Sequence, residues 1–201
     1  MQWYQEEIQR LAQLPVTQEA RPKVVFYGSS TFTRWASLGQ DFPQVQAVNL
    51  GFGGSTLAAC AWFFEQVVPR QRPAALLIYA GDNDLGDGRT PEEVLLFFEQ
   101  LLASSRAGLG AIPLCVISIK PSPARQYLHD SMVRANGWMA QRLAALGPPH
   151  YFLDLYPLML DAQGAPNRAL FEADGLHLSP AGYDLWQQQT AAQLVRMGLS
   201  Q

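Results

Sequence analysis

Five apolar runs, each ending in glycine or a polar turn, constrain the fold of this chain more than any other feature. They are rich in aliphatic and aromatic side chains and lie at residues 23–27, 45–50, 74–80, 113–119 and 150–155. Strands that are apolar along their whole length are typical of a parallel sheet that is covered on both faces. The runs therefore predict five parallel strands in the interior of the protein.

Helical patterns fill the segments between the runs, at residues 56–67, 91–104, 130–146 and 179–197. Two of these segments begin with an N-cap followed by proline: Thr90 precedes Pro91, with Glu93 in the first turn, and Ser179 precedes Pro180. Strands that alternate with helices predict an α/β fold. We expect a doubly wound, three-layer α/β/α sandwich around a five-stranded parallel sheet, as in flavodoxin-like proteins.

Residues 1–20 predict a helix packed on the rest of the chain, because Trp3, Ile8, Leu11 and Leu14 fall roughly on one helical face. No repeat, low-complexity tract or linker divides the 201 residues, so we expect a single domain over residues 1–201. This first segment lacks the basic and apolar regions of a secretory signal, which favours a cytoplasmic protein. The oligomeric state stays open, as a monomer or a small homo-oligomer.

Charge and cysteine content argue against several classes of partner. The formal net charge is -3, and basic residues do not cluster, so neither nucleic acid nor an anionic membrane surface is expected as a partner. No apolar stretch reaches the roughly 20 residues of a membrane anchor. Cys60 and Cys115 lie in apolar runs without a CxxC spacing, which predicts buried free thiols rather than a metal site.

Polar and small residues follow the predicted strands at the points where a ligand is expected. In doubly wound sheets, ligands bind beyond the carboxyl ends of the strands. Ser30 follows the first strand, Gly54 the second and Asn83 the third, and Asp174 and His177 precede the last helix. Parallel strands bring their carboxyl ends to one edge, so we expect these residues to meet there.

The spacing of Asp174 and His177 suits a carboxylate that holds an imidazole in one orientation and leaves its other nitrogen free to take a proton. A serine hydroxyl such as that of Ser30 needs such a base to become a nucleophile. His129 and His150 have no acidic partner at a strand end, which leaves His177 as the best base. The alternatives are an incidental histidine in a solvated loop, and a helix cap formed by Ser30.

Gly54 and Asn83 can supply the donors that an acyl-transfer site needs, a backbone N–H and a side-chain amide for the oxyanion. The alternatives are a glycine turn or phosphate loop for the first and an Asx-turn for the second. No lysine follows the glycines as in a phosphate-binding P-loop, and their spacing and position do not match a dinucleotide fingerprint.

A calcium loop is a further alternative, because Asp82, Asp84 and Glu93 occupy its first, third and twelfth positions. Asp87 stands at the sixth position, where the loop requires glycine. The pattern therefore does not favour a calcium ion.

Taken together, these motifs resemble the SGNH hydrolase family, also called GDSL-like lipases and esterases. The resemblance runs from about Lys23 to the last helix. The residues that carry it, in family order, are Gly28-Ser29-Ser30, Gly54, Gly81-Asp82-Asn83-Asp84, and Asp174 with His177. Ser29 replaces the aspartate of the family's first block, and with Arg34-Trp35 after it the segment is similar to a bacterial subgroup.

The resemblance implies hydrolysis of carboxylic esters with short acyl or acetyl groups through an acyl-enzyme on Ser30. It implies His177 as base, Asp174 as its orienting partner, and an oxyanion hole formed by the Ser30 N–H, the Gly54 N–H and the Asn83 amide. No cofactor is implied, and the partner is a small ester. Alternatives are a lysophospholipase, an acyl-CoA thioesterase, or a non-catalytic protein that binds carbohydrate or acyl ligands.

Two sets of side chains are weaker candidates for contact with a ligand. Arg34, Lys120 and Arg125 are expected at the rim of the pocket, although a proline-rich loop with solvated charges explains the last two equally well. Four aromatic residues could offer stacking surfaces, namely Trp35, Trp62, Trp138 and Tyr127. Core packing is the more favoured interpretation of Trp62 and Trp138, which lie in apolar helical patterns.

Overall fold

The computed structural model of the chain describes residues 1–17 and 19–199. At its centre lies a parallel sheet of five strands in the order β2-β1-β3-β4-β5. The strands are β1 (Lys23–Gly28), β2 (Gln46–Gly51), β3 (Ala75–Tyr79), β4 (Leu114–Ile117) and β5 (His150–Leu153). Each lies within one or two residues of the run that predicted it, so the parallel sheet is confirmed.

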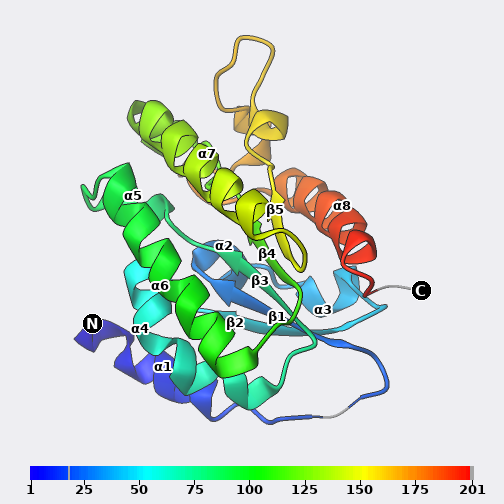
Figure 1. Ribbon diagram of the computed structural model, residues 1–201. Helices are drawn as coiled ribbons and strands as arrows, with labels where there is room; N and C mark the ends of the chain where they lie inside the picture. The colour runs from blue at the N-terminus through cyan, green and yellow to red at the C-terminus, as the bar shows by residue number, and fades with distance from the viewer. Residues whose placement is uncertain (18, 200–201) are drawn as a thin grey trace.

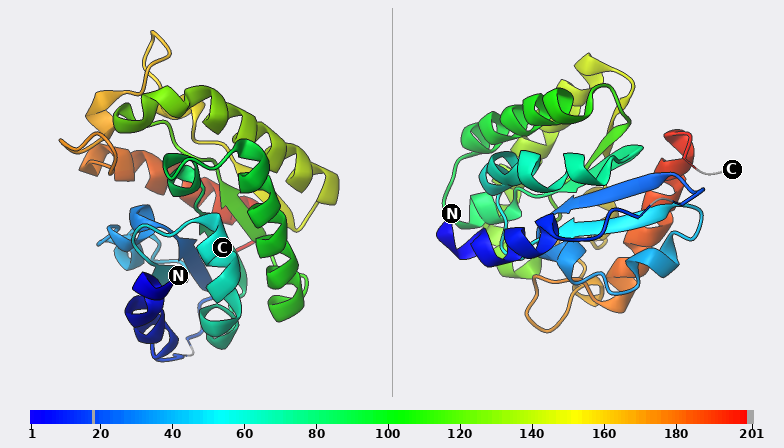
Figure 2. Two further views of the ribbon diagram at one scale, coloured as in Figure 1. Left: turned by 90° about the vertical axis from the view of Figure 1, so that its left-hand side faces the viewer. Right: turned by 90° about the horizontal axis from the view of Figure 1, so that it is seen from below.

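Helices cover both faces of the sheet, which completes the predicted three-layer α/β/α sandwich (Figures 1 and 2). One face is covered by α1 (Gln5–Ala12), α4 (Leu57–Val67), α6 (Pro91–Leu109) and α7 (His129–Leu146). The other is covered by α2 (Ser30–Thr33), α3 (Leu38–Asp41) and α8 (Pro180–Arg196). The remaining helical segments are α5 (Asp82–Gly86), η1 (Gln2–Tyr4), η2 (Pro69–Gln71), η3 (Pro123–Leu128), η4 (Pro157–Met159) and η5 (Arg168–Leu170).

The inner strand β1 shows why the runs are apolar throughout. Val25 and Tyr27 belong to the core between the sheet and α4, whereas Val24 and Phe26 belong to the core on the α8 side. All four side chains are fully buried. Successive strand residues point to opposite faces, so a strand with helices on both sides needs apolar residues at every position.

The predicted helix starts form as expected. The Thr90 hydroxyl accepts from the Glu93 N–H, and the Glu93 carboxylate accepts from the Thr90 N–H, which makes a reciprocal capping box at the start of α6. The Ser179 hydroxyl accepts from the Gly182 N–H at the start of α8. Helix α6 continues past its predicted end to Leu109, because the first residue that stops it is Gly110, with a φ of 71°.

The N-terminal segment packs on the rest of the chain, but its α-helix covers only Gln5–Ala12 rather than residues 1–20, and the residue that anchors it differs from the prediction. Ile8 and Leu11 of α1 are buried as expected. Trp3 is 84% exposed, because it lies in the short 3₁₀ turn η1 before α1 begins. The adjacent Tyr4 takes the inward place, with its ring centroid 5.4 Å from that of Phe52.

The prediction of core packing is wrong for Trp62, whose residue surface is 68% exposed on α4. Helix α4 is apolar around nearly its whole circumference, so the apolar pattern alone does not identify its outer face. Its exposed residues are Trp62, Glu65 and Gln66, which follow helical spacing. Trp138 is half-buried between α6 and α7.

No described helix combines the length and apolar character needed to cross a membrane.

Candidate active site

The first strand ends in a close approach to its neighbour that requires glycine. Gly28 has a φ of 150°, and a Cβ at this position would lie 1.8 Å from the Tyr79 carbonyl oxygen. The Ser29 N–H donates to that same oxygen at 2.9 Å, and α2 begins at Ser30 immediately afterwards. Ser30 therefore lies at the carboxyl edge of the sheet, and as the first residue of a helix it has no intrahelical acceptor for its N–H.

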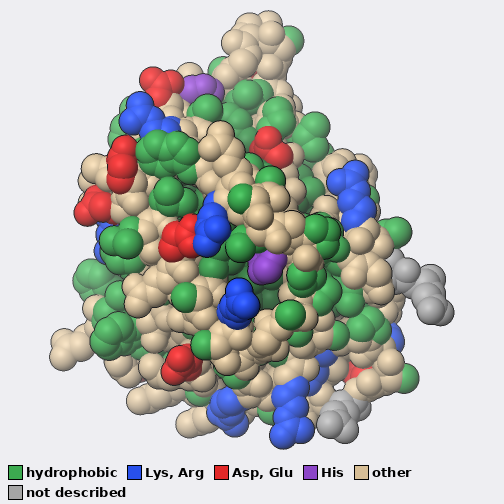
Figure 3. All heavy atoms as spheres, in the orientation of Figure 1, with side chains coloured by type: hydrophobic (Ala, Val, Ile, Leu, Met, Phe, Trp, Pro, Cys, Tyr) green, Lys and Arg blue, Asp and Glu red, His purple; other side chains and the backbone are tan. Residues whose placement is uncertain are grey.

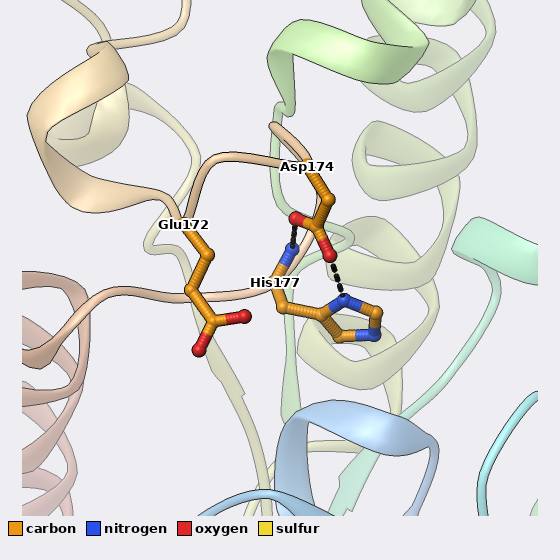
Figure 4. Close-up of side chains that lie close together, drawn as sticks. All are labelled: Glu172, Asp174 and His177. Atoms are coloured by element: carbon orange, nitrogen blue, oxygen red, sulfur yellow. Dashed lines mark hydrogen bonds and ion pairs between the residues drawn. The ribbon is translucent and has the colours of Figure 1, made fainter.

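The structure brings Ser30, His177 and Asp174 into one hydrogen-bonded chain. The His177 Nε2 lies 3.2 Å from the Ser30 Oγ, and the His177 Nδ1 lies 2.6 Å from the Asp174 Oδ2. Figure 4 shows the imidazole bonded to Asp174 on one side, with the blue ribbon below it on the other. The Asp174 carboxylate accepts, and a neutral imidazole that donates from Nδ1 presents its other nitrogen to the Ser30 hydroxyl.

The backbone of the loop before α8 holds the Asp174 carboxylate in place. Its Oδ1 accepts from the Leu176 N–H at 2.9 Å and from the His177 N–H at 3.0 Å. Gly175 makes the turn between them with a φ of 66°. The hydrogen bond from the His177 side chain, followed by these two backbone bonds, holds the pKa of Asp174 well below its ordinary value.

Ser29 takes the N-cap position of α2, yet its side chain makes no cap bond. The Ser29 Oγ is buried, and within the described residues it has no hydrogen-bond partner. The capping interpretation of Ser30 does not hold either, because Ser30 is the first residue inside the helix and its hydroxyl lies against His177.

Gly54 lies in a tight turn after β2, in which the Ser55 N–H donates to the Phe52 carbonyl at 3.2 Å. Its φ of 72° suits glycine, and a Cβ built on it would meet nothing within 4 Å, so the space beside it is open. No acceptor within residues 1–17 and 19–199 is bonded to its N–H. Its carbonyl accepts from the Tyr4 hydroxyl at 2.8 Å, which ties the N-terminal segment to this turn.

Asn83 lies on α5 directly after β3, and its amide is bonded on both sides. The Asn83 Nδ2 donates to the Ser55 carbonyl at 3.0 Å, which places this side chain beside the Gly54 turn. The Asn83 Oδ1 accepts from the Arg125 Nη2 at 2.9 Å. One hydrogen of the amide nitrogen is left over for a substrate oxygen.

The expected pocket rim is corrected for Lys120, which is only 2% exposed. Its ammonium donates to the Asp82 Oδ2 at 3.1 Å and to the Tyr79 hydroxyl at 3.0 Å, and these two partners hold it inside the fold. Arg125 is half-buried and bonded to Asn83 rather than solvated. The prediction of a loop with solvated charges is therefore also wrong for these two residues.

Arg34 is exposed and forms an ion pair with Glu172, with the Arg34 Nη1 3.0 Å from the Glu172 Oε2. Glu172 lies beside Asp174 and His177 in Figure 4. Arg34 and Glu172 also line a surface hollow of about 310 Å³ with Leu178 and Tyr183. The face shown in Figure 3 mixes apolar, basic and acidic side chains rather than presenting one kind.

The acidic residues of the notional calcium loop are engaged elsewhere. Asp82 pairs with Lys120, Asp84 accepts from the Leu57 N–H, and Glu93 belongs to the cap of α6. Among the described residues, the one group of acidic, histidine or cysteine side chains close enough to share an ion is Glu172, Asp174 and His177, which contains none of the three. Cys60 and Cys115 are buried free thiols, as predicted, and burial raises the pKa of both.

Several residues that shape the site were not predicted from the sequence. Asp84 accepts from the Leu57 N–H at 2.7 Å and from Arg89, and so joins the start of α4 to α5. Its burial has the largest influence on its pKa and raises it. The Tyr183 hydroxyl donates to the Thr31 carbonyl at 2.9 Å and holds α2 against α8. The position of Asp84 within the third motif was the available signal, whereas nothing in the local sequence marked Tyr183.

Trp35, an expected stacking surface, is buried in the core, and Tyr127 is exposed.

Comparison with solved structures shows the same fold in several proteins of low sequence identity. One from Bacteroides fragilis has a TM-score of 0.81 at 21% identity, over 96% of this chain and 95% of its own. A GDSL-like lipase from Bacteroides thetaiotaomicron has a TM-score of 0.77 at 20% identity, over 96% and 97%. A carbohydrate esterase of family 3 from Talaromyces cellulolyticus has a TM-score of 0.73 at 15% identity, over 88% and 97%.

No significant relative is found among curated proteins. The sequence profile of the GDSL-like Lipase/Acylhydrolase family matches residues 10–185, which is most of the chain. The resemblance expected from the four motifs is thereby confirmed. The chain belongs to the GDSL-like Lipase/Acylhydrolase family and is a hydrolase of the SGNH type.

Proposed function

We propose that this protein is an esterase that removes short acyl or acetyl groups through an acyl-enzyme on Ser30. The observation that carries the proposal is the position of His177, with one ring nitrogen 3.2 Å from the Ser30 Oγ and the other 2.6 Å from Asp174. This arrangement can move a proton from the hydroxyl while the carboxylate stabilises the imidazolium that forms.

In the acylation step, the Ser30 Oγ bonds to the ester carbonyl carbon and its proton passes to the His177 Nε2. The negative charge then moves to the carbonyl oxygen, where the N–H groups of Ser30 and Gly54 and the Asn83 amide donate hydrogen bonds to it. Collapse of this intermediate breaks the bond to the leaving alcohol, which takes the proton from His177. In deacylation, water repeats the sequence and releases the carboxylic acid and free Ser30.

Comparison with two solved structures supports a short acyl group. Two proteins with the same fold are named for related reactions, the carbohydrate esterase of family 3 and an acetyl esterase.

A panel of p-nitrophenyl esters from acetate to palmitate, with acetyl-CoA, palmitoyl-CoA and lysophosphatidylcholine beside them, tests this proposal. We expect the highest kcat/KM for acetate or butyrate and a steep decline with longer chains. A maximum at palmitate or lysophosphatidylcholine would make the protein a lipase or lysophospholipase, and a maximum at an acyl-CoA would make it a thioesterase. No turnover of any ester or thioester would favour a binding protein on the same scaffold.

Ser30→Ala and Ser29→Ala form a matched pair for the assignment of the nucleophile. We expect Ser30→Ala to lower kcat by roughly a million-fold, as loss of a triad serine does in other hydrolases. Ser29→Ala removes a hydroxyl that has no partner within the described residues, so we expect near wild-type turnover. Equal activity of the two variants would contradict the assignment.

A further inference from the structure

Behind Asn83 lies a buried cluster of charges that the reaction described above does not use directly. Asp82 and Lys120 are buried, and the side chain of Arg125 is only 17% exposed. The Asp82 Oδ2 lies 3.1 Å from the Lys120 Nζ and 3.3 Å from the Arg125 Nη1. The guanidinium then reaches Asn83 through its Nη2. The four side chains form a continuous line from the interior to the expected oxyanion donor.

The charge on this cluster is net positive. Burial works to raise the pKa of Asp82, but the Lys120 ammonium and the Arg125 guanidinium outweigh it, and the pKa is lowered from its ordinary value. Asp82 is therefore an anion at neutral pH, paired with two cations. One positive charge is left uncompensated next to the place where the oxyanion develops, in a region from which water is largely excluded.

The orientation of the Asn83 amide depends on its two partners. The Arg125 guanidinium has only donors, and the Ser55 carbonyl is an acceptor. If the amide turned over, its NH₂ group would face the guanidinium and its oxygen would face a carbonyl. Arg125 thus selects the orientation in which Nδ2 lies toward the Gly54 turn.

The local backbone is shaped to admit the guanidinium. A Cβ built on Gly86 would lie 2.9 Å from the Arg125 Cζ. The absence of a side chain at Gly86, at the end of α5, leaves room for the Arg125 guanidinium in the position from which it reaches Asn83.

We propose that Arg125 is a positioning residue of the oxyanion hole, which locks the Asn83 amide with its donor toward the substrate, and that Lys120 and Asp82 hold Arg125 for this purpose. This proposal rests on the proposed function, in which Asn83 is an oxyanion donor. It differs from a role at the pocket rim, in which Arg125 would contact the substrate itself, and from a purely structural role.

The test is a double-mutant cycle of Arg125→Met and Asn83→Ala, with kcat and KM measured on p-nitrophenyl acetate. Loss of an oxyanion donor costs about 100- to 1000-fold in kcat, so we expect Asn83→Ala to fall in that range. We expect Arg125→Met to lower kcat by roughly tenfold or more, up to that full loss, with KM nearly unchanged. In the Asn83→Ala background, the same change should cost less than about threefold, because its target is gone.

Gly86→Ala is the second arm, because it keeps the arginine and displaces it. We expect it to lower kcat like Arg125→Met, again only while Asn83 is present. Arg125→Lys keeps the charge but cannot reach Asp82 and Asn83 at once with a planar fork, so we expect it to restore part of the loss at most. Arg142→Met, which removes a cation from an exposed pair with Glu99, is the matched control and should keep wild-type kcat.

Three outcomes overturn the proposal. An Arg125→Met loss that is just as large in the Asn83→Ala background means that Arg125 acts on its own. A rise in KM at constant kcat means that it binds substrate at the rim. Unchanged kcat in Asn83→Ala means that Asn83 is not an oxyanion donor, so Arg125 has no donor to position. The activity of Ser30→Ala then decides separately whether Ser30 forms the acyl-enzyme. Thermal unfolding of each variant identifies any that fail to fold, in which case Gly86→Ala, with Arg125 intact, carries the test.

Discussion

The His177 imidazole is the side chain around which the site is fitted. Asp174 and the loop backbone hold one side of the ring, and Ser30 lies against the other. The neighbouring ion pair of Arg34 with Glu172 keeps a second carboxylate engaged beside the ring. The spacing of Asp174 and His177 in the sequence was enough to predict their contact, because three residues in a tight turn leave few alternatives. It could not predict Glu172, which reaches the same place from the start of the turn.

The pH dependence of kcat/KM is a test at this scale. The pKa of Asp174 lies below the ordinary value of an aspartate, which is about 4. The carboxylate therefore stays ionised as the pH falls from neutrality to about pH 4. Protonation of Asp174 therefore does not contribute to loss of activity between about pH 4 and neutrality. We expect log(kcat/KM) to fall on the acid side with a slope of about one, which reports a single proton. A slope of two in this interval would mean that Asp174 titrates together with another group.

The elements position these side chains through short connections at the strand ends. The strands and the long helices were predicted within a few residues, apart from the longer end of α6, because each shows a full apolar period or a cap. Helices α2, α3 and α5 were not predicted, since four or five residues are too few to show a period. Contacts with distant elements hold them instead, such as the hydrogen bond from the Leu57 N–H at the start of α4 to the Asp84 carboxylate of α5.

The N-terminal segment should affect catalysis through a single hydrogen bond. Tyr4→Phe removes the bond to the Gly54 carbonyl and keeps the packing on Phe52. We expect a loss of about 0.5–1.5 kcal/mol in the free energy of unfolding. We also expect a severalfold fall in kcat on p-nitrophenyl acetate, because the Gly54 turn is less firmly held. Trp3→Phe, at an exposed position, is the control, and equal effects of the two variants would show that the bond does not matter.

The capping box of α6 makes a prediction about stability alone. Thr90→Ala removes the hydroxyl that accepts from the Glu93 N–H and should cost about 1 kcal/mol. For a protein of this size, that lowers Tm by about 2–4 °C in a thermal melt. Ser104→Ala on the same helix removes a hydroxyl outside the cap and should leave Tm within about 1 °C, since alanine favours a helix. A larger drop for Ser104→Ala than for Thr90→Ala would contradict the role of the cap.

At the scale of the whole molecule, the parallel sheet brings together residues that are 147 positions apart, as Ser30 and His177 are. That gathering could be predicted, because all carboxyl ends of parallel strands share one edge. The buried line from Lys120 to Asn83 could not, because it depends on the register of β4 beside β3 and on the turn of η3 over α5. In the sequence, Lys120 and Arg125 stand in a proline-rich stretch that is typical of an exposed loop.

The central claim is that Ser30 is the residue that forms the covalent intermediate. It is tested most directly by reaction with a fluorophosphonate, followed by mass spectrometry of the peptides. We predict a stoichiometric adduct on Ser30 in the wild type and in Ser29→Ala, no adduct in Ser30→Ala, and much slower labelling in His177→Ala. An adduct on another serine, or an active enzyme that forms none on Ser30, would contradict the account.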